Sequence, residues 1–330
     1  MTHPCSGGNN GQSPCRECPP DSVAAARLTG IACEPIDIRR VVRRMRGGSQ
    51  AHMVEGSDGR FYVAKFTGNP QGNRTLINEF IAYHFLQRLQ VSTPALHILR
   101  LSEETRDKAR LCFKMGSGST CVQPGLHLGS QCPVNPATTV IFDFLPRQLV
   151  PLVLNLCDFV KVLVVDKLLG QTDSRQCIFV RDRGHNGSRP GFRAYMIDHG
   201  LTFAGERWEF QDSLLHGLYF EKAVYSMIDM HTLRRETVDI IRECDESGLY
   251  DAVANIPSTW FGEGDYAALA KLFSRLLNRV ARVESLLSYH LSGLIVKRDE
   301  AIKAEAADLV LSASPPDSFA PTLVLGPETF

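Results

Sequence analysis

The alternation of apolar and polar residues predicts three short strands in the first third of the chain. They are Ile36 to Met45, His52 to Glu55 and Arg60 to Phe66, the last reading RFYVAKF. Two linkers of small and polar residues separate them, RGGSQA from Arg46 and GSDG from Gly56. Such linkers are typical of antiparallel hairpins, so the pattern predicts strand, glycine loop, strand, turn and strand in that order.

Helical periodicity starts after this predicted sheet. Apolar residues recur at helical spacing over 75–89 and predict a helix there. Residues 91–101 are expected to be extended, because Pro94 disfavours helical backbone in the residue before it. Residues 102–138 are polar and rich in turn formers, and the pattern assigns them no element. The apolar run at 140–146, VIFDFLP, predicts a strand that serves as a hinge between two halves of the chain.

The second half of the chain is mainly helical in its pattern. A buried helix is predicted over 151–169, and the polar residues within its apolar stretch make it unfit to cross a bilayer. Asp265 is placed to act as the N-cap of a long amphipathic helix. The further predicted helices, including that amphipathic one, cover 220–230, 233–246, 266–289 and 297–311.

Two apolar runs, Cys177 to Val180 and Phe192 to Ile197, predict a β-hairpin between these helices. Asp173 precedes the first run and Asp198 follows the second. The corresponding ends of an antiparallel pair are neighbours, so the two carboxylates are expected to face one pocket. One carboxylate can orient a hydroxyl while the other holds a metal on a phosphate, as phosphoryl transfer requires. Either aspartate alone is also consistent with an ordinary turn former, and that alternative stays open.

Three upstream features suit a bound nucleotide. A glycine loop between strands allows backbone N–H groups to approach phosphates. Lys65, near the end of the third strand, can reach the phosphates as a point charge, and Glu79 in the following helix can pair with it. The simpler alternatives are a plain turn for the glycines and an exposed helix position for Glu79. The loop residues assigned to nucleotide binding are Gly47, Gly48, Ser49 and Gln50.

Composition narrows the class of protein. The 330 residues are 44% hydrophobic and 22% charged with no net charge, which is typical of a soluble globular protein and does not point to nucleic acid or anionic membranes. The arginines over 39–46 keep nucleic-acid binding open as a weaker hypothesis. No secretory signal is recognised at the start, so a cytoplasmic location is expected. Cys15 and Cys18 have zinc-ligand spacing but lack a second pair of ligands.

Seven segments match one family in the same order along the chain. They are GGSQ at 47–50, YVAKF at 62–66, NPQG at 69–72, NEFIAY at 78–83, GQTDSRQ at 170–176, AYMIDHG at 194–200 and IPSTW at 256–260. With them, the chain resembles the HipA-like kinase family over residues 36–300. The resemblance implies an α+β, two-lobed protein-kinase-like fold with an antiparallel-sheet N-lobe at 31–146 and a mainly helical C-lobe at 147–311. Composition adds disordered tails at 1–30 and 312–330.

The resemblance implies a phosphotransferase that uses ATP and Mg²⁺. The expected acceptor is a Ser or Thr hydroxyl on a protein that the sequence does not identify. By position, Lys65 would hold the phosphates and Glu79 would orient Lys65. Asp173 would be the catalytic aspartate and Asp198 a Mg²⁺ ligand.

Two positions depart from the pattern that the resemblance implies: His199 follows Asp198 where many kinases have Phe, and the other concerns a metal ligand. The metal-binding Asn that follows the catalytic aspartate by five residues is replaced here by Ile178. We therefore assign Gln176 as the second Mg²⁺ ligand, since an amide oxygen can coordinate this ion. The departure keeps an alternative open, in which a kinase-fold module binds nucleotide or a partner with little or no turnover. Neither a membrane nor nucleic acid is an expected partner.

Overall fold

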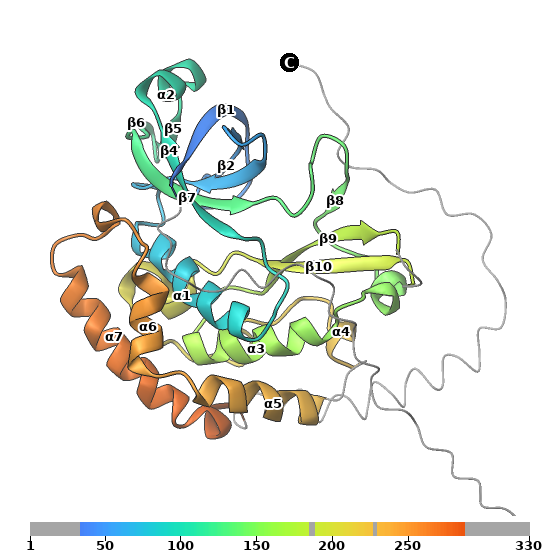
Figure 1. Ribbon diagram of the computed structural model, residues 1–330. Coiled ribbons are helices and arrows are strands. Elements are labelled where there is room, and N and C mark those ends of the chain that lie inside the picture. Colours follow the sequence, from blue (N-terminus) through green and yellow to red (C-terminus); the bar gives the residue numbers. More distant parts are fainter. Residues whose placement is uncertain (1–33, 185–188, 227–229, 288–330) are drawn as a thin grey trace, which may run out of the picture. The chain divides into compact units, whose positions relative to one another are not determined.

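The computed structural model describes residues 34–184, 189–226 and 230–287 (Figure 1). The chain divides into two units, Met1–Ala32 and Cys33–Phe330, and all described residues belong to the second. The two predicted tails and the helix predicted over 297–311 lie outside the described residues. Helices and largely antiparallel sheets coexist in this unit, which confirms the predicted α+β class.

Five strands close into a barrel. In barrel order they are β1 (Ile36–Arg44), β2 (His52–Gly56), β3 (Phe61–Lys65), β7 (Gly125–Gln131) and β4 (Leu96–Leu101). The first three confirm the predicted strands, and the parallel pairing of β1 with β4 closes the barrel. Burial alternates along β3, so Tyr62 and Ala64 enter the barrel core while Lys65 lies on the opposite face.

Helix α1 (Arg74–Arg88) follows β3 and confirms the helix predicted over 75–89. Its apolar residues join the larger of two hydrophobic cores, which also contains the apolar side chains of α3 (Cys157–Leu169). Glu79 is buried within this helix, so the alternative that it is an exposed helix residue is wrong. A buried carboxylate needs a charged or hydrogen-bonding partner, which the site below supplies.

Residues 102–138, to which the pattern assigned no element, contain four elements. They are α2 (Glu103–Ala109), β5 (Cys112–Met115), β6 (Gly118–Cys121) and the barrel strand β7. β5 and β6 form a separate two-stranded hairpin, with Phe113 and Val122 buried in the barrel core. Each strand has only four residues, and those of β6 are all exposed, so the alternation was too short to be recognised.

The hairpin that carries the two aspartates is confirmed. β9 (Gln176–Asp182) pairs antiparallel with β10 (Gly191–Ile197), and Gln176 lies opposite Ile197. β8 (Ile141–Phe142) pairs with the other edge of β9, so the strand predicted over 140–146 is only two residues long. The chain leaves β8 before Pro146 and enters the 3₁₀ helix η1 (Arg147–Leu152).

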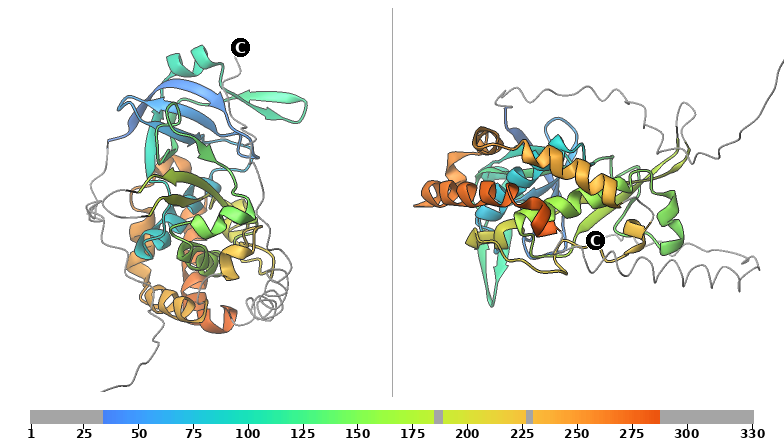
Figure 2. Two further views of the ribbon diagram at one scale, coloured as in Figure 1. Left: turned by 90° about the vertical axis from the view of Figure 1, so that its right-hand side faces the viewer. Right: turned by 90° about the horizontal axis from the view of Figure 1, so that it is seen from below.

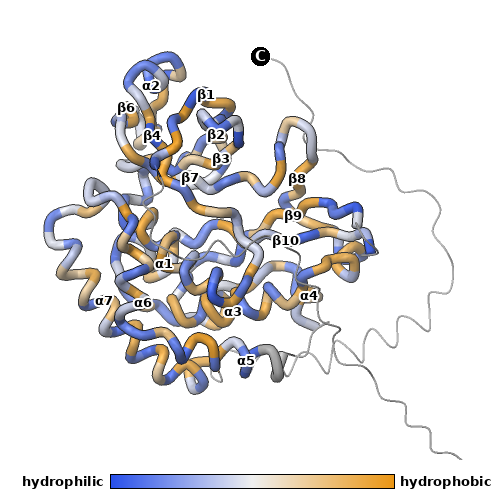
Figure 3. The backbone as a smooth tube through the Cα atoms, viewed as in Figure 1, coloured by the Kyte–Doolittle hydropathy of each residue, from blue (hydrophilic) through white to orange (hydrophobic). Residues whose placement is uncertain are grey.

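Helix α3 starts at Cys157 rather than at the predicted residue 151. Pro151 lies within η1, and the N–H of Leu154 donates to the carbonyl of Phe192 at 2.8 Å, which holds this stretch against β10 instead of in a helix. Almost every residue of α3 is buried. Its hydrophobic character is visible in Figure 3, where orange dominates the α3 tube.

The remaining helices differ from the predicted boundaries. They are α4 (Ala223–Ser226), α5 (Met230–Arg242), α6 (Glu246–Val253) and α7 (Asp265–Val280). Of the helix predicted over 220–230, only α4 and the first residue of α5 are helical in the described part. The helix predicted over 233–246 ends at Arg242. In the one predicted over 266–289, a turn at 281–282 interrupts the helix after Val280 and residues 283–287 are helical again, while 288–289 lie outside the described residues. Gly264, not Asp265, is the N-cap of α7, because the Asp265 carboxylate accepts the Gly262 N–H at 2.7 Å instead.

The β9–β10 hairpin lies between the barrel and helix α3 in Figure 1 and in the left-hand view of Figure 2. Helix α5 lies on the far side of α3 from the barrel, and α7 runs beside α6 along one side of the helices (Figure 1). The end of β3, the start of α1 and the end of β10 therefore meet around one region. Among the described residues, every helix falls short of the length and apolarity needed to span a lipid bilayer.

Candidate active site

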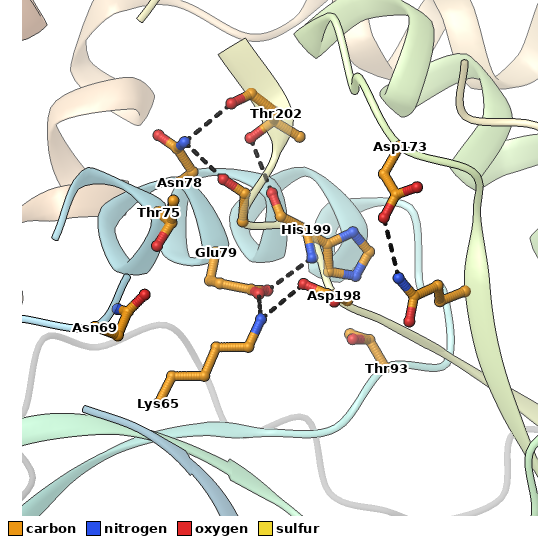
Figure 4. A network of polar contacts seen from close by, with 12 residues as sticks. Lys65, Asn69, Thr75, Asn78, Glu79, Thr93, Asp173, Asp198, His199 and Thr202 are labelled. Atoms are coloured by element: carbon orange, nitrogen blue, oxygen red, sulfur yellow. Dashed lines mark hydrogen bonds and ion pairs between the residues drawn. The ribbon is translucent and has the colours of Figure 1, made fainter. Parts of the chain in front are cut away.

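Lys65, the last residue of β3, lies between two carboxylates. Its Nζ atom is 2.5 Å from Oε1 of Glu79 and 2.7 Å from Oδ1 of Asp198 (Figure 4). Glu79 comes from α1 and Asp198 directly follows β10, so barrel, helix and hairpin each contribute one side chain. The structure thus brings together three predicted site residues, of which Lys65 and Asp198 are 133 positions apart.

This Lys65 cluster carries an excess of negative charge. Burial alone would lower the pKa of Lys65, but the carboxylates of Asp198 and Glu79 raise it above its ordinary value. Lys65 in turn lowers the pKa of Asp198, against the effect of burial. The side chain of Asp198 is 36% exposed and that of Glu79 only 6%. One ammonium facing two ionised carboxylates therefore leaves a negative charge that is accessible at Asp198.

The backbone of Asp198 has a left-handed conformation, with φ of 61°. This conformation costs a non-glycine residue about 1–2 kcal/mol. Two side-chain donors hold its carbonyl oxygen, Nη2 of Arg175 at 2.8 Å and Nε2 of Gln171 at 3.2 Å. The turn lets the Asp198 carboxylate reach Lys65 while the chain continues toward α1. Strained backbone of this kind is concentrated at functional sites.

Arg175 belongs to a buried polar cluster behind Asp198. Its Nη1 donates to Nδ1 of His199 at 2.7 Å, and its Nε lies 3.5 Å from Oδ2 of Asp166 in α3. Burial raises the pKa of Asp166 to about 6, although Arg175 favours the ionised form. Burial and the charge of Arg175 hold the pKa of His199 well below its usual range. The imidazole is therefore neutral and accepts from Arg175, which fixes the peptide that follows Asp198.

Asn78 fastens the chain after Asp198 to helix α1. Its Nδ2 donates to the carbonyls of Gly200 and Thr202 at 2.9 Å and of Gly205 at 3.1 Å. Its Oδ1 accepts the indole N–H of Trp208 at 2.8 Å. The neighbouring Glu79 adds a further bond, because its Oε2 accepts the His199 N–H at 3.0 Å. Helix α1 therefore positions both the Lys65 partner and the segment that carries Asp198.

Sequence reasoning assigned no role to Arg175 or Asn78, although both lie in the matched segments. Their hydrogen-bond partners are backbone carbonyls and side chains more than 20 positions away, and Asp166, which pairs with Arg175, lies in a different element, so no local pattern reports these contacts. One signal was available: Arg175 precedes a strand whose first apolar residue is buried, and a charged residue at such a boundary needs a buried partner.

Asp173 lies in the loop before β9, at the same end of the hairpin as Asp198. Its Oδ1 accepts the Ser174 N–H at 2.7 Å, and its Oδ2 accepts Nε2 of Gln176 at 3.2 Å (Figure 4). The Gly217 N–H donates to its carbonyl at 2.8 Å and holds the loop. Asp173 is half-buried and stands apart from the Lys65 cluster in Figure 4. That both aspartates face one pocket stays a prediction.

The glycine loop connects β1 and β2. Gly47 and Gly48 are exposed, and φ of Gly47 is 116°, a value that favours glycine. Ser49 is buried. The side-chain amide of Gln50 is engaged by the backbone of Lys114 in β5, donating to its carbonyl at 2.7 Å and accepting its N–H at 2.9 Å. Gln50 therefore anchors the loop to the β5–β6 hairpin, and the glycines are its open part.

The donor set near Asp198 fits a nucleotide-bound Mg²⁺. Within the described ranges, no group of three or more His, Cys, Asp or Glu residues is arranged to hold an ion. Mg²⁺ in nucleotide sites needs fewer protein ligands, because one or two carboxylates and the phosphates hold it. Asp198 offers a partly exposed carboxylate of which Lys65 engages Oδ1. The exposed Gln176 turns its Nε2 toward Asp173, so its carbonyl oxygen is left as an acceptor for a cation.

Arg39 and Arg40 pair with Glu55 at 3.6 and 2.6 Å, so part of the arginine-rich strand is neutralised. Cys15 and Cys18 lie outside the described residues.

Comparison with known proteins finds similarity to solved structures of kinases. No family model and no curated protein matches the chain. It is similar to the Helicobacter pylori proinflammatory kinase CtkA, with 12% identity and a TM-score of 0.46 over 78% of this chain and 99% of that one. It is also similar to a Golgi casein kinase, with 13% identity over 78% and 75% of the two chains, at TM-scores of 0.42 and, with Mn/ADP bound, 0.43. Similarity at this level carries no conclusion about activity, and membership of the HipA-like family stays a prediction.

Proposed function

We propose that this protein is a kinase-like phosphotransferase, which moves the terminal phosphoryl group of ATP to a hydroxyl group. The observation that carries the proposal is the Lys65 cluster, in which one lysine from the barrel is held by a helix carboxylate and a hairpin carboxylate. Phosphoryl transfer needs positioned charge rather than covalent chemistry, and such a cluster supplies it. The glycines of the loop at 47–50 offer backbone N–H groups for the phosphates.

Each residue has a distinct role in this proposal. Lys65 binds phosphate oxygens, and Glu79 keeps its ammonium in place when Asp198 is engaged by a cation. Mg²⁺ bound with ATP would neutralise phosphate charge, held by Asp198 and Gln176. Asp173 accepts a hydrogen bond from the acceptor hydroxyl and orients it toward the phosphate.

The finer points belong to the same proposal. We infer a Ser or Thr hydroxyl on a protein as the acceptor, and a division into an N-lobe at 31–146 and a C-lobe at 147–311. The HipA-like resemblance over the matched segments supports both points.

A second candidate is a kinase-fold module that binds nucleotide with little or no turnover. One observation favours it: both carboxylate oxygens of Asp173 already accept hydrogen bonds, from Ser174 and Gln176. An acceptor hydroxyl would have to share the carboxylate or displace Gln176. The two candidates differ in transfer but not in nucleotide binding.

The test uses the full chain with Mg²⁺ and γ-labelled ATP. We expect label on the protein or on an added protein acceptor, and its loss in Asp173→Asn with nucleotide binding retained. Asp198→Asn should lose transfer as well. Asp182→Asn is the matched control, because this residue lies at the opposite end of β9 and should leave transfer unchanged.

Melting temperature with and without ATP and Mg²⁺ separates the candidates, since a ligand stabilises the folded state that it binds. A rise without transfer would favour the binding module. Transfer by Asp173→Asn at the parent rate would refute the assignment of the catalytic aspartate. If the parent shows no transfer and its melting temperature does not rise with ATP and Mg²⁺, the nucleotide site is refuted.

A further inference from the structure

Two cysteines face each other across the β5–β6 hairpin. Cys112 and Cys121 are directly opposite residues of the antiparallel ladder, and their Sγ atoms are 3.3 Å apart. Cys121 is exposed and Cys112 is half-buried, whereas Cys132, Cys177 and Cys244 are buried. Cys157 is half-buried like Cys112, but it lies at the start of α3, so Cys112 and Cys121 form an accessible dithiol on the hairpin.

The hairpin geometry suits a covalent bond between the two sulfurs. Directly opposite residues of an antiparallel pair have Cα atoms about 4.5–5.5 Å apart. Disulfides span Cα distances of about 4.4–6.8 Å, so the bond needs no rearrangement of the backbone. The alternate face of the hairpin buries Phe113 in the barrel core, which leaves the cysteine face toward solvent and accessible to a small oxidant.

We propose that Cys112 and Cys121 are a reversible disulfide site, oxidised by a small-molecule disulfide such as glutathione disulfide. The thiolate of the exposed Cys121 attacks one sulfur of the oxidant and releases one glutathione thiolate. The thiolate of Cys112 then attacks the Cys121 sulfur of the mixed disulfide and releases the second glutathione thiolate. The two cysteines lose two electrons and two protons, and the oxidant becomes two glutathione thiols.

The site is connected to the glycine loop. Lys114, two positions after Cys112 on β5, holds the side chain of Gln50 through both of its backbone hydrogen bonds. Gln50 has a left-handed backbone with φ of 52°, and its N–H donates to the Gly47 carbonyl at 3.2 Å. A disulfide across β5 and β6 would stiffen the hairpin that anchors this loop. An effect on nucleotide affinity rests on the proposed function, whereas the disulfide and the stiffening do not.

The chemical test equilibrates the full chain in reduced and oxidised glutathione, alkylates free thiols and maps the linked peptides by mass spectrometry. Trypsin cuts after Arg110, Lys114 and Arg147, so Cys112 lies on peptide 111–114, while Cys121 shares peptide 115–147 with Cys132. We expect the two peptides to be linked in oxidising buffer and separate after reduction. The link should persist in Cys132→Ser and vanish in Cys121→Ser. In Cys112→Ser, glutathione should remain attached to Cys121.

Full alkylation of Cys112 in oxidising buffer, or linkage of Cys112 to any cysteine other than Cys121, would overturn the site. Amide hydrogen exchange tests its connection to the loop without nucleotide. We expect slower exchange at the N–H groups of Gln50 and Lys114 in the oxidised chain, with no such change in Cys121→Ser. Equal exchange in the two redox states would refute the connection, whatever the outcome of the transfer assay.

Discussion

Replacement of Lys65 by methionine would remove the cation that separates two carboxylates. Both carboxylates contact its Nζ atom, at 2.5 and 2.7 Å, so their nearest oxygens are no more than about 5 Å apart. At an effective dielectric constant of about 20, two unit charges at this separation repel each other by about 3 kcal/mol. In the parent, the two attractions to Lys65 offset this repulsion, and Lys65→Met leaves it uncompensated. Removing one partner of a buried ion pair costs about 3–5 kcal/mol, so we expect the free energy of unfolding to fall by at least about 3 kcal/mol at pH 7.

The loss should depend on pH in one direction. Without Lys65, the repulsion raises the folded-state pKa of one carboxylate above its unfolded value near 4. The folded variant then binds more protons than the unfolded chain between that value and the raised one, so its stability falls as pH rises through this window. The deficit relative to the parent should be smaller at pH 5 than at pH 7. Adding Glu79→Gln removes one of the two charges, so the double variant should be more stable than Lys65→Met alone.

Urea denaturation at both pH values measures these differences, with the fluorescence of the buried Trp208 and Trp260 as the signal. Lys161→Met is the control, because its Nζ donates to the Leu89 carbonyl at 3.0 Å rather than to a carboxylate. It should cost about 1 kcal/mol equally at both pH values. An equal deficit of Lys65→Met at pH 5 and pH 7, with no gain from Glu79→Gln, would refute the charge cluster.

Three further expectations concern folding stability. Asn78→Ala should lower the free energy of unfolding by about 3 kcal/mol or more, because it leaves several buried groups unpaired. Arg175→Met should lower the free energy of unfolding by about 3–5 kcal/mol, because it leaves the buried Asp166 carboxylate without its cationic partner. Adding Asp166→Asn to this variant should restore part of that stability. Burial lowers the pKa of His127 from 6.5 to about 4, so the folded state loses stability as pH falls between those values. Between these pH values, the free energy of unfolding of His127→Phe should fall by about 3 kcal/mol less than that of the parent.

Each of these is read by denaturation of parent and variant at matched pH. Asn135→Ala, at an exposed turn, is the control for Asn78 and should cost less than about 1 kcal/mol. If Asn78→Ala lowers the free energy of unfolding by no more than Asn135→Ala does, Asn78 does not anchor the segment after Asp198. No recovery from Asp166→Asn would contradict the buried pair, and parallel pH profiles of parent and His127→Phe would contradict the shifted pKa.

The elements that the sequence pattern predicted best have long or regular burial patterns. β3 alternates over its full length, α1 buries apolar residues at helical spacing along its length, and the β9–β10 hairpin has seven paired positions. The hydropathy pattern predicted the wrong structure where tertiary contacts determine the backbone conformation. Pro151 and the pairing of Leu154 with β10 shorten the helix predicted over 151–169. The four-residue strands β5 and β6 were too short for their alternation to be seen.

The charged residues of the candidate site could be predicted from the sequence, but the residues that hold them in position could not. Lys65, Glu79 and Asp198 stand at ends or turns of predicted elements, where chemistry-bearing side chains are expected. Arg175 and Asn78 act on backbone carbonyls that only the folded chain brings near them. The engagement of Gln50 by β5 was hidden for the same reason, since β5 itself was not predicted.

The 133-residue separation between Lys65 and Asp198 bears on how the protein emerges from the ribosome. Because domains fold from the N-terminus during synthesis, the barrel and α1 can form first, with Lys65 and Glu79 as a neutral pair. The excess negative charge arises only when β10 and the following Asp198 have been translated and have folded back onto the barrel, and such non-local contacts form slowly. Under the proposed function, a nascent chain would bind a metal-bound nucleotide only after the hairpin has formed, so the order of translation would determine when the site becomes complete.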